Sequence, residues 1–248
     1  MTIHQERDKL KDKIVLIVGG TGGIGTAIAK NVSAQGAKVV IAGRNREKAE
    51  QIAQKINADG GDAYAIDVDV TKIESVKNLA LQVSQGLGKI DILVNAFGRG
   101  LIQPILDVDP ANAKNVIDVN VYGTFLVTQT MIPFMNTDST SHILMFPGTM
   151  GKFIMRNSSI YSASKFAIQG FTKALTEELK RDNIRFTLFY LGGVNTEFWE
   201  DELVQMRVKK EAMLSAKEVA DVVAATLSLP QSAVMNEIVM QPSSHQLV

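Results

Sequence analysis

The chain has 248 residues, of which 46% are hydrophobic, and its 26 Lys and Arg balance its 26 Asp and Glu to give a formal net charge of 0. This hydrophobic content can supply the core of one large domain and argues against global disorder, and the balanced charge argues against binding to nucleic acid or to an anionic membrane, which requires clustered positive charge. The absence of cysteine excludes disulfides, thiolate metal sites and a cysteine nucleophile.

The chain begins with a charged segment. Residues 1–13, MTIHQERDKLKDK, lack the apolar stretch of a signal peptide, and no apolar run reaches the ~18 residues that span a membrane. We therefore expect a cytoplasmic protein with no membrane association, in which residues 1–10 are flexible. The histidines His4, His142 and His245 lie in no pattern that indicates catalysis or metal binding, so we expect no metal site.

Short apolar runs alternate with longer amphipathic segments along the whole chain. The runs are almost continuously apolar, which is typical of parallel strands buried on both faces. We expect about seven strands, at residues 13–18, 38–42, 63–68, 91–95, 142–146, 185–190 and 236–240. Segments with helical spacing lie between them, for example at residues 25–35, 46–60, 72–86 and 167–182, and Gly36, Gly60 and Gly86 stand at expected helix C-termini. The alternation predicts one α/β domain over residues 1–248, a Rossmann-like doubly wound parallel sheet with helices on both faces and ligands at the carboxyl ends of the strands.

The first predicted strand runs directly into the sequence GGTGGIG, residues 19–25, which a helix follows. Its glycines lack the Cβ atoms that would keep a pyrophosphate from the backbone, and the helix N-terminus offers unpaired N–H groups to an anion. A glycine-rich turn without a ligand is the alternative, but the strand–loop–helix context favours a nucleotide. We expect this part of the nucleotide site to consist of Gly19, Thr21, Gly23, Ile24 and Gly25.

The end of the second predicted strand bears on the choice of nucleotide. Sites that prefer NAD place a carboxylate here to bind the ribose 2′-hydroxyl, but this chain has Gly43 followed by Arg44 and Asn45. An arginine pairs with a 2′-phosphate through several donors. Arg44 and Arg46 are otherwise ordinary solvated arginines at a helix start. The pattern favours NADP(H), with Arg44 and Asn45 in the site.

Two further strand ends are predicted to contact the nucleotide. Asp69 and Val70 follow the third strand, where the Asp69 carboxylate is placed to accept from the adenine amino group, to cap the next helix, or to do both. The sequence NAFG, from Asn95 to Gly98, follows the fourth strand, where a backbone turn is expected to pass under the adenine ribose.

The segment from Ile143 to Lys165 carries the candidate chemistry. Tyr161 and Lys165 are four residues apart, so they share one face of a helix. A free tyrosine has a pKa of ~10, and an ammonium group one turn away stabilises its phenolate. The alternatives are a core tyrosine with a structural hydroxyl and an exposed helix lysine. Asn120, in the middle of another predicted helix, is a candidate for the same chemistry or for a hydrogen bond to a neighbouring loop.

Taken together, these motifs resemble the single-domain form of the short-chain dehydrogenase/reductase family, over about Lys11 to Gln241. The matching motifs are the glycine loop at Gly19, Gly23 and Gly25, the segment from Asp69 to Thr71, NAFG, Asn120 in VIDVNVYG, Tyr161 and Lys165 in YSASKFA, and LGGVNT at 191–196. The chain departs from the family pattern at Ala96 and Phe97, where NAFG replaces Asn-Asn-Ala-Gly, and at Leu191, which replaces a proline.

The resemblance implies hydride transfer between the nicotinamide C4 and a carbonyl carbon, with Tyr161 as the proton donor or acceptor. It further implies that Lys165 holds the nicotinamide ribose hydroxyls and that Asn120 places a water that links Lys165 to solvent. Val194 and Thr196 are expected to bracket the nicotinamide. The ending NEIVMQP resembles NADP-dependent members that act on small or medium carbonyl compounds and hydroxy acids.

One family position differs in a way that concerns the reaction itself. The family places a serine at the end of the fifth strand to bind the substrate oxygen, and here that position falls on Gly148. Thr149 is the nearest hydroxyl, and a glycine permits backbone angles that would turn it inward. Ser158 and Ser159 are more distant candidates. We expect either that Thr149 replaces the serine or that the site is slow, in which case Gly148→Ser would raise turnover.

Apolar residues are expected around the substrate, and apolar helices at a subunit contact. The candidate pocket residues are Phe97, Phe153, Ile154, Met155, Phe198 and Trp199, although core or subunit-contact roles explain them equally well. Residues 197–215 form the expected substrate-side insertion. The segments 115–135 and 161–179 are apolar on more than one face, which predicts a homotetramer or homodimer.

The sequence therefore favours an NADP(H)-dependent oxidoreductase, of the carbonyl reductase type, acting on a small or medium carbonyl or alcohol substrate. The alternative is a catalytically weak NADP(H)-binding protein that acts as a sensor or assembly partner, which Gly148 and Ala96 favour. Retention of Tyr161, Lys165 and Asn120 favours the enzyme.

Overall fold

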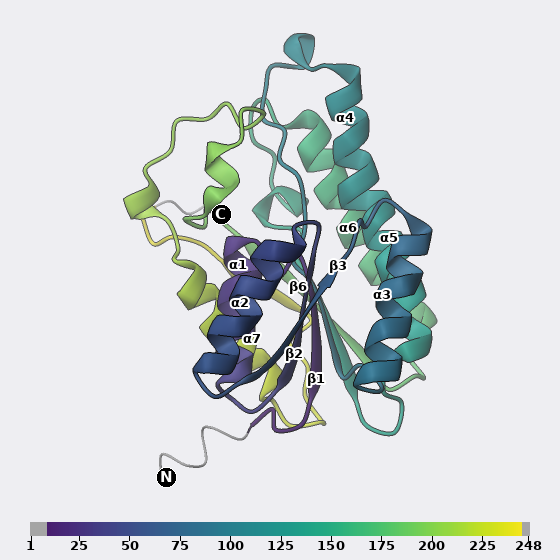
Figure 1. Ribbon diagram of the computed structural model, residues 1–248. Helices are drawn as coiled ribbons and strands as arrows, with labels where there is room; N and C mark the ends of the chain where they lie inside the picture. Colours follow the sequence, from purple (N-terminus) through teal and green to yellow (C-terminus); the bar gives the residue numbers. More distant parts are fainter. Residues whose placement is uncertain (1–8, 245–248) are drawn as a thin grey trace.

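The computed structural model describes residues 9–244 (Figure 1). All its strands lie in one parallel sheet of seven strands, in the order β3-β2-β1-β4-β5-β6-β7, which confirms the predicted fold class. The strands are β1 (Ile14–Val18), β2 (Lys38–Gly43), β3 (Asp62–Asp67), β4 (Ile92–Asn95), β5 (Ser141–Met145), β6 (Ile184–Leu191) and β7 (Glu237–Met240).

The strand order reverses at β1, and this places the crevice for a ligand. Chain connections leave β1 toward β2 on one side and return on its other side through β4, so the loops after β1 and β4 diverge there. Val18 at the end of β1 is paired with Ala42 of β2 and with Asn95 of β4. The loops that follow these three residues therefore start at the same level of the sheet.

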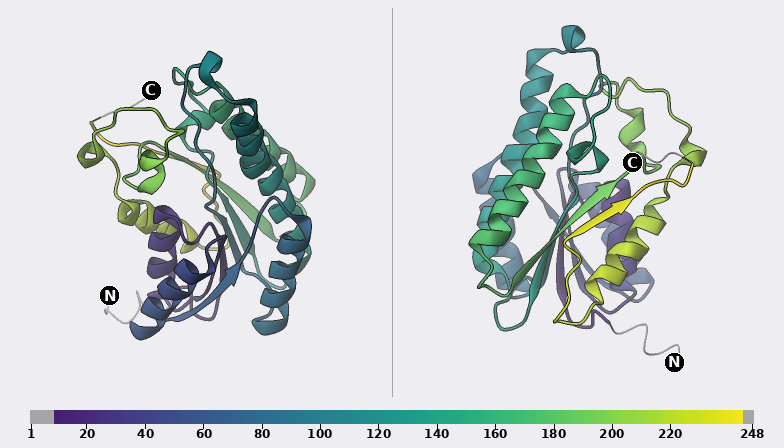
Figure 2. Two further views of the ribbon diagram at one scale, coloured as in Figure 1. Left: turned by 45° about the horizontal axis from the view of Figure 1, so that its top comes forward. Right: turned by 180° about the vertical axis from the view of Figure 1, so that it is seen from behind.

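Helices cover both faces of the sheet. They are α1 (Gly23–Ser33), α2 (Arg46–Ala58), α3 (Ile73–Gly86), α4 (Pro110–Ile117), α5 (Gly123–Met131), α6 (Ser159–Glu178) and α7 (Ala216–Leu227). Buried residues of α1, α2 and α7 belong to one hydrophobic cluster, and those of α3, α5 and α6 belong to a second cluster on the opposite face (Figure 2). The result is the three-layer arrangement that the alternation of strands and helices predicts.

The two clusters explain why the strands have no polar alternation. In β1, Val15 and Ile17 enter the first cluster, whereas Ile14, Leu16 and Val18 enter the second. Every residue of this strand is buried because successive side chains point to opposite, equally covered faces.

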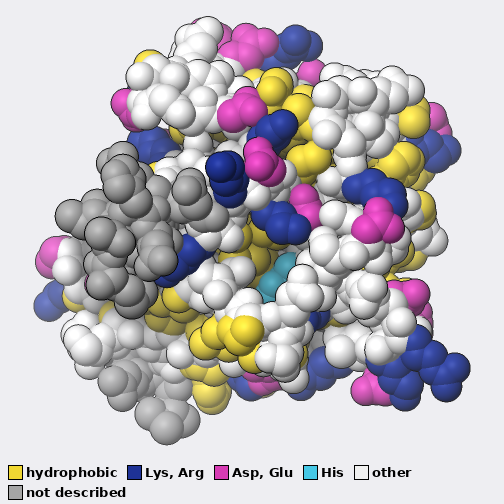
Figure 3. All heavy atoms as spheres, turned by 90° about the horizontal axis from the view of Figure 1, so that it is seen from below, with side chains coloured by type: hydrophobic (Ala, Val, Ile, Leu, Met, Phe, Trp, Pro, Cys, Tyr) yellow, Lys and Arg dark blue, Asp and Glu magenta, His cyan; other side chains and the backbone are white. Residues whose placement is uncertain are grey.

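The N-terminal segment is only partly described by the structure. Residues 1–8 of the segment expected to be flexible lie outside the described residues, whereas Leu10 is buried and donates its N–H to Gln35. Gly36 and Gly60 adopt the expected positive φ of 90° and 86°, but Gly86 is the last residue of α3 and Gly88 takes that conformation instead. Within residues 9–244, no helix has the length and apolar character needed to cross a membrane. Seen from below, charged side chains of both signs are interspersed (Figure 3).

Candidate active site

The loop between β1 and α1 is a tight cradle that side chains would fill. Gly19 has a φ of 85°, and a Cβ added to it would lie 2.6 Å from the backbone nitrogen of Phe97. A Cβ on Gly25 would lie 2.3 Å from the Gly19 carbonyl oxygen. The first turn of α1 has no acidic side chain, and Gly22 at its N-cap offers no capping group. Unpaired N–H groups of this turn therefore face an open anion site, which fits a dinucleotide pyrophosphate.

The loop after β6 lies against this cradle. A Cβ on Gly23 would come within 2.6 Å of the Thr196 Cγ2 atom, so two residues expected in the nucleotide site are in contact. Val194 is buried, and its carbonyl accepts a hydrogen bond of 2.9 Å from the Trp199 indole. Trp199 therefore anchors this loop and is not free to line a substrate pocket with its polar edge.

At the end of β2, the side chains of two neighbouring arginines differ in their partners. Arg46 forms ion pairs with Glu50 at 2.8 Å and with Asp67 at 3.5 Å. Arg44 is exposed and has no ion pair with any residue that the structure describes. Arg44 is thus the arginine of this pair that is available to a 2′-phosphate.

Gly43 and Asn45, on either side of Arg44, have structural roles. A Cβ on Gly43 would lie 2.8 Å from the Thr21 hydroxyl oxygen, so the residue cannot be an acid unless Thr21 moves. The Asn45 side chain caps α2 by accepting from the backbone N–H of Lys48 at 2.9 Å. The predicted contact of Asn45 with the nucleotide stays a prediction.

Asp69 does not cap α3, whose N-cap is Lys72 and has no side-chain hydrogen bond, so the predicted capping role is wrong. Its carboxylate accepts from the backbone N–H and the hydroxyl of Thr71, at 3.1 and 2.7 Å, and pairs with Lys72 at 3.2 Å. Partial burial opposes ionisation, but these interactions outweigh it and lower the pKa of Asp69. Val70 is buried against Gly123, where an added Cβ would meet Val70 at 2.9 Å. Contact of either residue with adenine stays a prediction.

The side chain of Asn95 points into the protein core. It is 4% exposed, and its amide donates to the Thr128 hydroxyl at 3.2 Å, while its Oδ1 atom is buried without a partner. The predicted contact of the turn from Asn95 to Gly98 with a nucleotide therefore does not involve the side chain of Asn95 and stays a prediction for the rest of the turn.

Asn120 is fully buried in a π-helical turn, Asp118–Tyr122, that joins α4 to α5. Its Oδ1 accepts from the backbone N–H of Arg99 at 2.7 Å, and its amide donates to the Arg99 carbonyl and to the Ser164 hydroxyl, both at 3.0 Å. Both amide hydrogens are thereby used. The hydrogen bond to a neighbouring loop, which the sequence left as the alternative role, is the one that the side chain makes. A water relay from its amide hydrogens would require one of these bonds to break.

Lys165 and Tyr161 lie together near the carboxyl ends of the strands, on α6. The Lys165 ammonium is buried, donates to the Phe146 carbonyl at 3.0 Å and lies 5.5 Å from the centre of the Tyr161 ring. Burial lowers the pKa of Lys165 to about 8 and raises that of Tyr161. Burial of the phenol therefore acts against its expected acidification.

Gly148 leaves the fifth strand in a conformation that explains its identity. Its φ of 66° and ψ of 174° lie in a region that almost only glycine adopts. There is room for a side chain, since an added Cβ would meet only the Leu191 carbonyl at 3.5 Å. Backbone strain, and not crowding, therefore disfavours a serine here, and the effect of Gly148→Ser on turnover stays a prediction.

Thr149 begins a 3-10 turn, Thr149–Gly151, that packs on α6. A Cβ on Gly151 would come within 3.2 Å of the Lys165 carbonyl oxygen, which places the turn directly beside the lysine. Thr149 is 5% exposed, and its hydroxyl has no hydrogen bond among the described residues. The hydroxyl oxygen is not completely buried, so it retains access to solvent. A donor is thus free near Lys165.

The two more distant candidate hydroxyls and several pocket residues have different surroundings, and Ser159 is exposed at the first residue of α6. Ser158 is fully buried, where its hydroxyl donates to the Met155 carbonyl at 2.6 Å and contacts the Ser162 hydroxyl at 2.8 Å. Phe97 packs on the core, and Ile154 is 80% exposed. The ring of Phe198 lies 5.9 Å from that of Tyr161 and is the predicted pocket residue closest to the chemistry in these contacts.

Two residues of this site were not among those predicted from the sequence. Ser164 bonds Asn120, and Arg99 follows NAFG with a backbone that Asn120 holds at both its N–H and its carbonyl. Ser164 lies within the YSASKFA sequence, which offered a hint, but no pattern pointed to Arg99.

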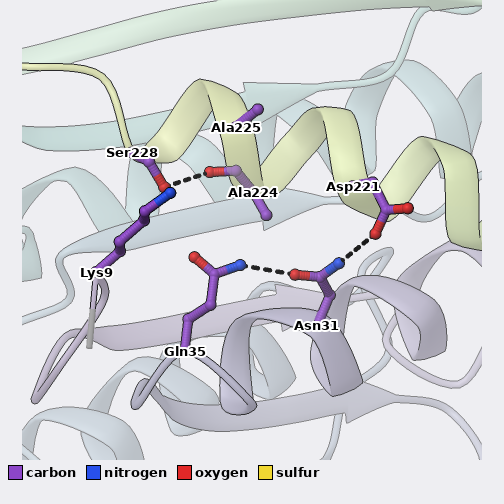
Figure 4. Close-up of a pocket in the computed structure, with 7 residues that line it drawn as sticks. All are labelled: Lys9, Asn31, Gln35, Asp221, Ala224, Ala225 and Ser228. Atoms are coloured by element: carbon purple, nitrogen blue, oxygen red, sulfur yellow. Dashed lines mark hydrogen bonds between the residues drawn. The ribbon is translucent and has the colours of Figure 1, made fainter. Parts of the chain in front are cut away.

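A hollow lies between α1 and α7, and none of the candidate active-site residues lines it (Figure 4). Its polar side chains satisfy each other: the Asn31 amide donates to Asp221 at 2.8 Å, and the Gln35 amide donates to Asn31 at 2.7 Å (Figure 4). These bonds tie the two helices together. Among residues 9–244, no group of three or more His, Asp or Glu side chains is placed to hold a metal ion.

Comparison with known proteins identifies the family. The sequence model described as short chain dehydrogenase matches residues 13–206. An uncharacterized oxidoreductase of Staphylococcus epidermidis is 33% identical over 234 residues, which cover 94% of this chain and 99% of the relative. A metagenomic short-chain oxidoreductase in complex with NADP has a TM-score of 0.82 at 26% identity, covering 95% of this chain and 99% of that one. An alcohol dehydrogenase of Thermococcus sibiricus, complexed with 5-hydroxy-NADP, shares the fold with a TM-score of 0.87 at 21% identity, covering 95% and 99% of the two chains. The chain belongs to the short-chain dehydrogenase family of oxidoreductases.

Proposed function

We propose that the protein transfers a hydride between NADP(H) and a small or medium carbonyl or alcohol substrate. The observation that carries the proposal is the buried Lys165 ammonium, 5.5 Å from the centre of the Tyr161 ring. The cradle of Gly19 and Gly25, with the unpaired Arg44, supports NADP(H), as do the solved relatives that contain NADP or a derivative of it.

Two residues of α6, Tyr161 and Lys165, are proposed to transfer the proton to or from the substrate oxygen. The Tyr161 phenol, whose pKa is raised by burial, is protonated at neutral pH and is the proposed donor to a carbonyl oxygen. A positive Lys165 stabilises the phenolate that remains. When bound, the nicotinamide supplies or accepts the hydride. Thr149 is proposed to hold the substrate oxygen, in the role that the family gives to a serine.

Asn120 is proposed to support this site by positioning. Its side chain fixes the loop at Arg99 and the helix at Ser164, and its own carbonyl accepts from the Thr124 hydroxyl at 2.6 Å. The π-helical turn is a feature that recurs at functional sites. A proton path from Lys165 through this turn stays part of the proposal.

The decisive experiment measures NADPH oxidation with a panel of ketones, aldehydes and keto acids. The proposal predicts turnover that Tyr161→Phe reduces by at least ~10²-fold, because the substrate oxygen loses its proton donor. Undiminished turnover by Tyr161→Phe contradicts the mechanism. Tight NADPH binding with no turnover on any compound would instead support the sensor or assembly role.

We also propose a homodimer or homotetramer built on α5 and α6. Tyr122, Phe125 and Phe166 are 48%, 37% and 38% exposed, which is unusual for aromatic side chains on neighbouring helices. Light scattering on the wild type and on Phe166→Asp tests this, since the charge is expected to dissociate the assembly. A monomeric wild type contradicts the proposal.

A further inference from the structure

The short segment after NAFG connects the two parts of the site. A Cβ on Gly98 would lie 3.4 Å from the Lys165 ammonium nitrogen. A Cβ on Gly100 would lie 2.7 Å from the ring of Phe198, which itself contacts Tyr161. Arg99 is therefore flanked by the proton-transfer residues on one side and by the substrate-side aromatic ring on the other.

The backbone of Arg99 is held firmly at this place. Asn120 accepts from its N–H at 2.7 Å and donates to its carbonyl at 3.0 Å, and Asn120 is itself fixed by the Ser164 hydroxyl on α6. Because the backbone of Arg99 is fixed by hydrogen bonds at both its N–H and its carbonyl, its side chain loses little additional entropy when it binds a ligand.

The guanidinium of Arg99 is not neutralised by the protein. Its Nε atom is buried without a hydrogen-bond partner, and Arg99 has no ion pair with any carboxylate in residues 9–244. A buried donor on a charged group is costly when left unsatisfied, so the site favours an anion that accepts from it.

Three carboxylates of the substrate-side segment have partners other than Arg99. In the substrate-side segment, Glu197 pairs with Lys48 at 3.0 Å and Glu200 pairs with Lys210 at 2.6 Å. Asp201 accepts from the backbone N–H of Leu203 at 2.9 Å. These acidic groups are engaged with their own partners, and so they do not offset Arg99.

We propose that Arg99 binds the carboxylate of the substrate, so that the carbonyl compound reduced is an oxo acid and the alcohol oxidised is a hydroxy acid. The inference rests on the proposed function and narrows its substrate class. A guanidinium binds a carboxylate through two donors at once, which fixes the distance between the charged end and the reacting carbonyl. The shared chemistry is an anionic oxygen, and the other source of it is a phosphate of the nucleotide.

The test compares 2-, 3- and 4-oxopentanoate with their methyl esters, which keep the carbonyl but lack the charge. For at least one pair, the wild type is expected to favour the acid, and Arg99→Gln to lower kcat/KM for that acid by ~10- to 100-fold, mainly through KM. The same variant is expected to change kcat/KM for the ester and the Kd for NADPH by less than about threefold, and Arg99→Lys to give an intermediate loss on the acid. Arg156→Gln, which removes an exposed arginine, is the matched control and is expected to leave the acid preference unchanged.

Each other outcome decides against the inference or against the reaction. Equal losses on acid and ester, or a wild type that prefers esters, overturn the role of Arg99 and leave the oxidoreductase intact. A large rise in the Kd for NADPH in Arg99→Gln assigns the arginine to a nucleotide phosphate. If neither acid nor ester is reduced, calorimetry with the NADP+-saturated protein decides: acid binding that Arg99→Gln abolishes supports the anchor while the proposed reaction fails, and no acid binding to the wild type overturns the anchor.

Discussion

The loops after β1 and β5 lie at the same end of the sheet, and each contains a glycine with positive φ, but the two glycines exist for different reasons. A side chain on Gly19 would collide with backbone atoms, 2.6 Å from the Phe97 nitrogen, whereas a side chain on Gly148 would meet only the Leu191 carbonyl at 3.5 Å. Crowding therefore fixes the first glycine, and backbone angle alone fixes the second.

This difference shows how the two halves of the site are built. In the nucleotide half, backbone segments pack closely against each other, so its geometry depends on the positions of glycines. The substrate half uses a turned loop that leaves space, and the side chain that works there, Thr149, is set by the angle of the residue before it.

The largest effect is expected at Thr149. Thr149→Ala removes the proposed donor to the substrate oxygen and should lower kcat by ~10²–10³, whereas Thr149→Ser should keep most of it. Steady-state kinetics with the best carbonyl substrate measures both. Gly148→Ser is the companion variant, and its strained φ should leave turnover no higher than that of the wild type. A clear gain from Gly148→Ser would mean that no hydroxyl occupies the position of the family's serine and that Thr149 does not replace it.

A comparable effect is expected from Gly19→Ala on nucleotide binding. The added methyl group must push the backbone at Phe97 away at a positive φ, and the Kd for NADPH should rise by about 10²-fold or more. Gly148→Ala is the matched control: it should keep the Kd for NADPH and lower the free energy of unfolding by about 1–3 kcal/mol. Fluorescence titration and urea unfolding separate the two. Similar Kd values for the two variants would remove the distinction between crowding and strain.

A smaller effect is expected at the end of β2. Arg44→Ala should weaken NADPH by ~10- to 100-fold and NADH by little, because a charge-assisted pair with the 2′-phosphate is lost. Arg46→Ala is the control, since Glu50 and Asp67 already engage that arginine. Titrations of both nucleotides with both variants measure the selectivity. An equal rise in the Kd values for NADPH and NADH would show that Arg44 does not bind the 2′-phosphate.

The smallest effect concerns the pH dependence of stability. Burial lowers the pKa of Lys165 to about 8, so the folded protein disfavours its charge, and the cost is full below pH 8 and declines as the pH rises toward the unfolded value near 10.5. Between pH 7.5 and 9.5, the unfolding free energy of the wild type should rise by about 2 kcal/mol relative to Lys165→Met. Urea unfolding without nucleotide measures this, and parallel pH profiles would contradict the buried charge.

The sequence was sufficient for the fold because each strand is apolar on both faces. All seven strands were predicted within about a residue or two, since runs such as IVLIV in β1 are typical of a parallel strand covered on both faces. The glycine cradle and the pair formed by Tyr161 and Lys165 were equally readable, because their spacing alone places them together.

The substrate half was less predictable, because its geometry depends on tertiary contacts. The positive φ of Gly148 follows from how the loop after β5 packs on α6, and the pKa of Tyr161 follows from burial that no motif encodes. Arg99 lies beside the site only because Asn120, 21 residues later in the chain, holds its backbone. Such positions are found from contacts and not from spacing.

The central claim is that Tyr161 and Thr149 act on one carbonyl oxygen at the nicotinamide. A crystal structure with NADP+ and a bound substrate or inhibitor tests it most directly. The account predicts that both hydroxyls lie within hydrogen-bond distance of the same ligand oxygen, with the carbonyl carbon of the ligand facing the nicotinamide C4. A ligand oxygen held by other groups, with either hydroxyl turned away from it, would contradict the account.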